Sequence, residues 1–198
     1  MSKRIKRVLA LTVALTLMAL SVACGQACGK KRVVSKYDQG YFDSFESLVK
    51  RADYIVRGEV LSKYCDSRSL RIPSEFDEVN GNYDAETVIT VYSIKVNESY
   101  TSSCESGALL DILVEGGETD KVIHICEEAP EFSVGSEYVF FLSQSRLFKN
   151  SAWLLNFYQS AYLVDAGEVR SGGFYGFEIT FDTLESIKRN ESGNGADS

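Results

Sequence analysis

Apolar and polar residues alternate with a period of two through much of the chain, and this pattern predicts strands. In residues 86–96, every second residue from Val88 to Val96 is aliphatic, aromatic or threonine. Residues 138–142 are apolar at every position, which is typical of a central strand with both faces buried. The same reasoning predicts strands at residues 54–61, 109–114, 122–126, 153–158 and 161–164, and an extended segment at 174–181.

A spacing of three and four residues replaces this alternation in residues 43–52, and residues 182–189 form a second segment with a helical start signal. In each segment an aspartate is followed three residues later by a glutamate, a pair that can form a capping box at the start of a helix. We therefore predict two short helices with Asp43 and Asp182 as their N-caps.

A polar stretch with one proline, residues 65–84, separates the first two predicted strands, and we interpret it as an inserted loop. Long loops without structure are uncommon in compact domains and are often functional, so this loop is a candidate for function. Aromatic residues gather near the C-terminus, among them Tyr158, Tyr162 and Tyr175. We expect them to pack in the core, and a ligand-binding face is the alternative.

Many short strands with two small helices predict a mainly β fold, a closed or partly open five- to seven-stranded OB-like barrel with short flanking helices. Closure would remove exposed strand edges. The expected organisation is a signal peptide at residues 1–23, a tether at 24–42, a single β-barrel domain at 43–190 and a disordered tail at 191–198.

The order of three segments supports this fold. A helix predicted at residues 44–52 leads into Ala-Asp-Tyr-Ile-Val-Arg-Gly-Glu-Val, a long strand ends near Val96, and Phe-Ser-Val-Gly-Ser-Glu-Tyr-Val-Phe-Phe-Leu follows at 132–142. Over residues 44–164 this order resembles exported bacterial proteins of the OB-barrel type. It is similar to the N-terminal domain of tissue inhibitors of metalloproteinases and to netrin-like modules. The resemblance implies the barrel and not the inhibition, which needs a Cys-x-Cys opening with a free terminal amine.

The first 24 residues have the pattern of an export signal: four basic residues, an uncharged run at residues 8–22, and small residues before Cys24. As a helix this run would span roughly 22 Å, less than the bilayer core of about 30 Å, which favours a cleaved signal. Leu-Ser-Val-Ala before Cys24 resembles a bacterial lipobox, although Ser21 stands where leucine is usual. The alternative is an ordinary signal cut after Ala23 or Ala27.

The lipobox resemblance implies that Cys24 is acylated. Two acyl chains are enough for lasting attachment, so the bilayer would be one partner of the protein. We therefore expect a lipid-anchored protein on the extracytoplasmic face of the cell membrane.

Charge excludes one class of partner. The chain has 21 Lys and Arg against 28 Asp and Glu, a formal net charge of −7, and removing the four cations of residues 1–23 makes it −11. An acidic domain repels phosphates, so we expect no nucleic-acid partner.

The five cysteines are Cys24, Cys28, Cys65, Cys104 and Cys126. An exported protein can form disulfides, and the predicted candidates are Cys104–Cys126 or Cys65–Cys126, with reduced thiols as the alternative. The chain has no Cys-x-x-Cys and no second histidine, so we predict no metal site and no cofactor.

His124, the only histidine, lies two residues before Cys126 on the same face of a predicted strand. A nucleophile–base pair needs a third, orienting group, and none is identifiable, so we predict a histidine with satisfied hydrogen bonds and no catalytic residue.

The expected function is that of a membrane-anchored, non-catalytic binding or envelope-interaction module. Its partner would be an extracytoplasmic protein, peptide or glycan. The alternatives are an extracytoplasmic hydrolase that uses His124 or a carboxylate pair, and a purely structural envelope component.

Overall fold

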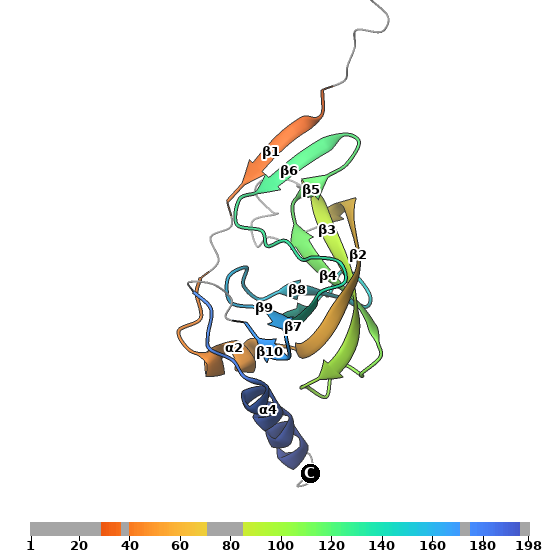
Figure 1. Ribbon diagram of the computed structural model, residues 1–198. Coiled ribbons are helices and arrows are strands. Elements are labelled where there is room, and N and C mark those ends of the chain that lie inside the picture. The colour runs from red at the N-terminus through yellow and green to blue at the C-terminus, as the bar shows by residue number, and fades with distance from the viewer. Residues whose placement is uncertain (1–28, 37–39, 71–84, 171–174, 195–198) are drawn as a thin grey trace, which may run out of the picture. The chain divides into compact units, whose positions relative to one another are not determined.

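The computed structural model describes residues 29–36, 40–70, 85–170 and 175–194 (Figure 1). The predicted signal peptide, Cys24 and Cys28 lie outside the described residues. The chain divides into two compact units, Met1–Lys31 and Arg32–Ser198, and the fold below is that of the second. Within the described part, no helix is long and apolar enough to cross a membrane.

The described chain is mainly β, as predicted. Its strands are β1 (Lys31–Ser35), β2 (Tyr54–Leu70), β3 (Ala85–Ser99), β4 (Leu109–Glu115), β5 (Gly117–Glu118), β6 (Val122–Cys126), β7 (Glu137–Gln144), β8 (Ser151–Leu154), β9 (Ala161–Asp165) and β10 (Glu168–Val169). Its helices are α2 (Phe45–Arg51) and α4 (Phe181–Asn194).

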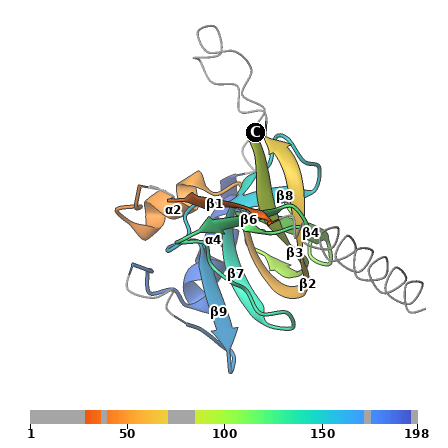
Figure 2. The same cartoon turned by 90° about the horizontal axis from the view of Figure 1, so that it is seen from above.

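Five strands close into a ring in the order β7, β2, β3, β4, β8 and back to β7 (Figure 2). Neighbours are antiparallel except β4 and β8, which are parallel. The ring closes because β7 pairs with two strands along the edge that faces away from β2. Its residues Leu142–Gln144 pair with β8 and complete the ring, whereas Glu137–Phe140 pair with β9. Strands that are far apart in the sequence therefore supply the hydrogen-bond partners of each other's backbone N–H and C=O groups.

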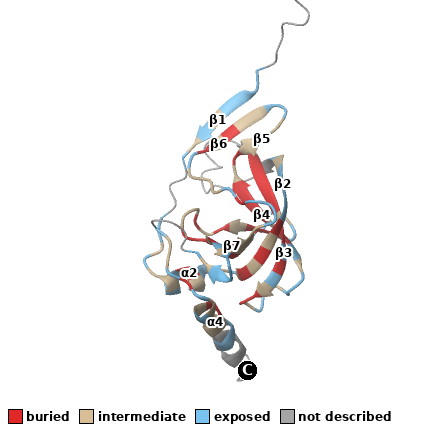
Figure 3. Cartoon of the chain, in the orientation of Figure 1, coloured by how far each residue is buried: buried red, intermediate tan, exposed pale blue. Residues whose placement is uncertain are grey.

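Two apolar clusters lie on opposite faces of β7, which confirms the predicted double burial. Phe140 and Leu142 point into a cluster to which all five ring strands contribute. Val139 and Phe141 point the other way, into a cluster that α2 and α4 cover with Leu48 and Leu184. Figure 3 shows buried residues along the ring strands.

A second sheet has the order β1, β6, β5. Its strand β1 corrects the predicted tether at residues 24–42, because Lys31–Ser35 pairs with β6 instead of forming linker. Burial along β1 is slight, so the apolar alternation that identifies a strand is weak there.

The predicted loop at residues 65–84 is also wrong in its first part, because β2 continues to Leu70 in register with β3. Residues 71–84 lie outside the described residues. Polar side chains are compatible with a strand here because this part of β2 lies beyond the ring. β2 pairs with β7 only over Tyr54–Glu59.

The N-caps lie close to the predicted residues, one position away in α2 and two positions away in α4. Ser44, not Asp43, is the N-cap of α2, and it forms a reciprocal capping box with Ser47. At α4, Thr180 accepts a hydrogen bond from the Thr183 backbone N–H at 3.2 Å, so Asp182 lies in the first turn. The helix then continues to Asn194, into the segment predicted as a disordered tail.

Two strand boundaries near the C-terminus differ as well. The strand predicted at 153–158 ends at Leu154, because Asn156 Oδ1 accepts from the backbone N–H groups of Tyr158 (2.8 Å) and Gln159 (3.2 Å) and turns the chain. The extended segment predicted at 174–181 contains no strand over its described residues.

An ionic network attaches α4 to the ring. Glu98 of β3 meets Lys188 of α4 at 3.2 Å and Arg57 of β2 at 3.5 Å. Arg57 also pairs with Glu137 of β7 at 3.2 Å, and its guanidinium lies 5.3 Å from the Phe181 ring centre. Burial alone would raise the pKa of Glu98, but these cations outweigh it, so the pKa is lowered.

A lowered pKa in the folded state means that Glu98 stabilises the fold above its unfolded pKa and that this contribution is lost as pH falls through the folded value. We expect Glu98→Gln to lower the free energy of unfolding by about 1 kcal/mol at pH 7. The difference from wild type should shrink as pH falls through the lowered pKa of Glu98, because the protonated carboxyl loses the interactions of the charged form. Urea unfolding at several pH values measures it, with Glu178→Gln as the control for an exposed carboxylate. A difference that does not depend on pH would contradict this role.

Candidate functional site

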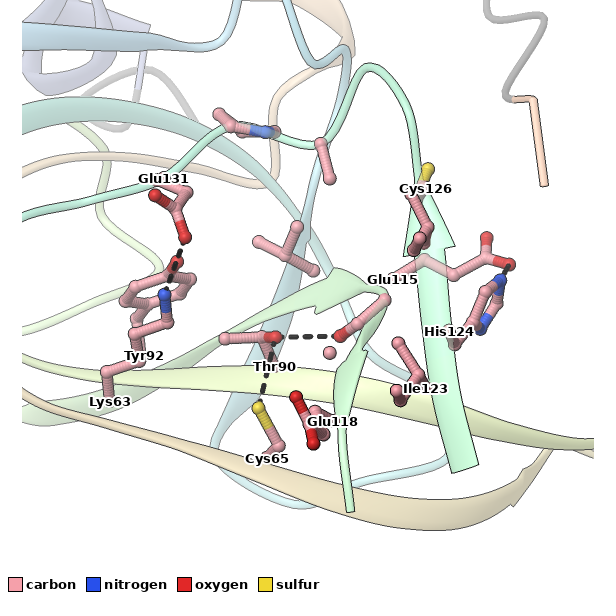
Figure 4. A pocket seen from close by; sticks show the side chains of 16 residues that line it. Lys63, Cys65, Thr90, Tyr92, Glu115, Glu118, Ile123, His124, Cys126 and Glu131 are labelled. Carbon is pink, nitrogen blue, oxygen red and sulfur yellow. Dashed lines mark hydrogen bonds and ion pairs between the residues drawn. The ribbon is translucent and has the colours of Figure 1, made fainter. Parts of the chain in front are cut away.

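A pocket of about 520 Å³ lies where the β2–β3 ribbon runs past the ring and meets β5 and β6 (Figure 4). Its walls come from β2, β3, β4, β5 and β6 and from residues 129–131. Lys63, Tyr92 and Glu131 form one end, and Glu115 and His124 form the other.

Two consecutive glycines line the pocket. Gly116 and Gly117 both have positive φ, +103° and +136°, which joins β4 to β5 in a way that other residues rarely allow. A Cβ on Gly117 would lie 2.8 Å from Cys65 Sγ and 2.8 Å from Thr90 Oγ1. Thr90 in turn donates to the Gly116 carbonyl at 2.7 Å, which fixes the dipeptide against β3.

The first end of the pocket carries a charged pair. Lys63 Nζ lies 2.9 Å from Glu131 Oε1 and 5.6 Å from the centre of the Tyr92 ring. The hydrogen bond to Glu131 raises the pKa of Lys63, and the same bond lowers the pKa of Glu131. Lys63 is therefore held as a cation and is not a nucleophilic amine.

The second end is organised by His124, which is 6% exposed. Its Nδ1 lies 3.1 Å from Thr87 Oγ1, and its Nε2 lies 2.9 Å from Ser35 Oγ and 3.5 Å from Glu115 Oε1. Both ring nitrogens thus have partners, as predicted. In a Ser-His-acid triad the serine and the acid bind opposite nitrogens, whereas here they share Nε2.

Cys126 follows on the same strand and is also buried, which confirms that the two side chains share a face. Burial raises the pKa of the Cys126 thiol. At neutral pH this group is a protonated thiol, whereas the thiolate is the form that acts as a nucleophile.

The three described cysteines are free. Cys65 Sγ lies 3.6 Å from Thr90 Oγ1, and Cys126 packs against Gly116. Figure 4 shows Cys65 and Cys126 apart, with Thr90 between them. Cys104 lies in the turn between β3 and β4, with Sγ 3.8 Å from the Glu105 carbonyl. Disulfide formation stays a prediction.

Carboxylates line the pocket without forming a metal centre. Glu115, Glu118 and Glu131 all contribute to its walls. Among the described residues, no group of three or more His, Cys, Asp or Glu side chains is placed to hold an ion. The residues that line the pocket include one lysine and three glutamates, so the pocket suits a neutral or cationic ligand better than an anion.

Sequence reasoning identified His124, Cys65 and Cys126 as candidates but not Lys63 or Thr90. The signal that could have identified Thr90 is that it is a polar member of the apolar face of its strand. Nothing in the sequence marks Lys63, because its role depends on the loop that brings Glu131 to it.

No protein-family model matches the chain, and no curated protein matches it in sequence. The residues of the pocket must therefore be interpreted from their geometry.

We expect Gly117→Ala to destabilise the protein by about 2–3 kcal/mol, because it adds a clash at Cys65 and Thr90 to an unfavourable φ. Gly107 provides the control: its φ is also positive (+89°), but no atom lies within 4 Å of an added Cβ. Gly107→Ala should cost about 1 kcal/mol. Denaturant unfolding of both variants measures the difference, and equal losses would show that the close packing around Gly117 contributes nothing.

Proposed function

We propose that this protein is a lipid-anchored, extracytoplasmic binding module with an OB-like barrel, and that it binds its ligand in the pocket beside β3 and β4. Numbered along the chain, the five ring strands close in the order 1-2-3-5-4, with the third and fifth parallel. That order supports the OB-like assignment and the resemblance to netrin-like modules. OB folds bind ligands on the face of their second and third strands.

The observation that carries the proposal is the position of the pocket. Thr90 and Tyr92 come from the second ring strand, and Val114 and Glu115 come from the third. The pocket therefore lies against the two strands from which OB folds bind ligands, and this supports the proposal. Its volume of about 520 Å³ lies within the usual range for small-ligand sites.

The chemistry of the pocket favours binding over catalysis. Lys63 is paired as a cation, the pKa of Cys126 is raised, and His124 is held by neighbours on both ring nitrogens. Lys63 and Cys126 therefore lack the activation that a nucleophile requires, and the Nδ1 of His124 is bound by Thr87 and not by the acid of a triad.

The first experiment tests the anchor. We expect Cys24→Ala to move the protein from the membrane fraction to the soluble extracytoplasmic fraction, because the acylated thiol would be lost. Cys28→Ala is the matched control and should leave the protein with the membrane. Fractionation followed by mass spectrometry of the mature N-terminus measures both. A Cys24→Ala protein that still sediments with the membrane would contradict the proposed attachment.

The second experiment tests the pocket. The full-length protein in detergent micelles is titrated with neutral sugars, amines and short peptides while backbone amide shifts are recorded. We expect at least one class to perturb amides around Thr90 and Glu115. Glu118→Trp, which narrows the pocket, should weaken that binding by about tenfold, whereas Glu168→Trp on β10 should not. Shifts that are absent for every class would contradict binding in the pocket.

A further inference from the structure

Three tyrosines from distant parts of the chain form one partly exposed aromatic surface, which we call the tyrosine platform: Tyr41, Tyr158 and Tyr175. Tyr41 and Tyr175 stack with ring centroids 4.6 Å apart, and Tyr158 lies 5.7 Å from Tyr41 and 5.6 Å from Tyr175. Tyr41 and Tyr175 are each 49% exposed. The prediction that the C-terminal aromatic residues pack in the core is therefore correct for Tyr162, which is fully buried, and wrong for Tyr158 and Tyr175.

Buried amides hold Tyr41 in place. Gln159 Oε1 accepts from the Phe42 N–H at 2.8 Å, and Gln159 Nε2 donates to the Phe42 carbonyl at 3.1 Å. Asn156 Nδ2 donates to the Gly40 carbonyl at 3.0 Å. Gln159 and Asn156 are 3% and 0% exposed. The backbone on both sides of Tyr41 is therefore fixed by the folded core.

The same turn positions Tyr158. Its backbone N–H donates to Asn156 Oδ1 at 2.8 Å, and the Asn156 N–H donates to Ser160 Oγ at 2.8 Å. Two of the three rings are thus attached to one buried hydrogen-bond network. Rigid aromatic side chains that are already ordered bind a partner with little further loss of conformational entropy.

The electrostatics of the platform favour a cation. The faces of aromatic rings carry negative potential and attract ammonium and guanidinium groups. Burial raises the pKa of Tyr158, and the negative charge of Glu128 is the next largest cause of that rise. Glu128 also contributes to the raised pKa of Tyr41, after burial and the two other tyrosines. The chain as a whole is acidic, with a net charge of −7.

We propose that the tyrosine platform is a docking site for an arginine-rich segment of a partner protein. Arginine fits better than lysine because its planar guanidinium stacks on aromatic faces and is more weakly hydrated. None of the three tyrosines lines the pocket, so the platform adds a second binding surface whether or not the pocket takes a ligand.

A hexa-arginine peptide tests the proposal by calorimetric titration of the full-length protein in detergent micelles. We expect Tyr41→Ala and Tyr158→Ala each to weaken binding about two- to fivefold, the range that one exposed cation–π contact gives. Tyr41→Phe keeps the ring and should bind as wild type does, and Glu128→Gln should weaken binding. Hexa-lysine should bind more weakly than hexa-arginine.

Two controls separate the platform from other acidic surfaces. Tyr64 of β2 is 44% exposed, and Tyr64→Ala should leave hexa-arginine binding unchanged. Glu118→Trp in the pocket should also leave it unchanged. Loss of binding with either control, or equal binding by wild type and Tyr41→Ala, would overturn the proposal and leave only attraction by net charge. Binding of chitohexaose that requires Tyr41, with no hexa-arginine binding, would overturn it in favour of a glycan.

Discussion

The double burial of β7 holds the fold together, because this one strand separates two apolar clusters and closes the ring. Phe140 and Leu142 fill the interior of the ring, while Val139 and Phe141 pack under α2 and α4. Both edges of β7 are also occupied, one by β2 and the other by β9 and β8. A strand so constrained fixes the register of its neighbours, since a slip of one residue would exchange its two faces.

Ring closure has a consequence for the pocket. β2 pairs with β7 only as far as Glu59, so the rest of β2 projects from the ring with β3 as its partner. Ile89 and Val91 pack one face of this ribbon against Leu113, and the other face would have little to pack against if the chain after β4 did not turn back at Gly116 and Gly117. The turn brings the β5–β6 pair over β3, and the space between them is the pocket. The glycines are therefore part of the fold as well as part of the site, because a side chain at Gly117 would occupy the position of Cys65 and Thr90.

The pattern of apolar and polar residues predicted two kinds of strand: those with one apolar and one polar face, and those with two apolar faces. The strand at residues 122–126 has the predicted bounds, and residues 138–142 lie inside β7. The missed strands are those held by pairing rather than by burial: β1, β5, β10 and the part of β2 after Leu61, where the side chains are largely polar. The parallel contact of β4 with β8 and the tyrosine platform could not be predicted, because both depend on segments that come together only after folding. For example, the two hydrogen bonds that hold the Phe42 backbone come from Gln159, which is 117 residues away in the sequence.

The buried side-chain amides of Asn156 and Gln159 also shorten the segment that connects the proposed anchor to the folded domain. An amide without a partner in the core is costly, so Asn156 and Gln159 require residues 40–42 to remain in place. Together with β1, this makes residues 31–35 and 40–42 part of the folded domain, although all of them fall within the predicted tether. If Cys24 is acylated, six residues separate it from β1, and the seven steps along the chain from Cys24 to Lys31 reach at most about 25 Å. A domain on so short a connection would work close to the lipid headgroups, so its partners would have to reach the platform and the pocket near the membrane surface.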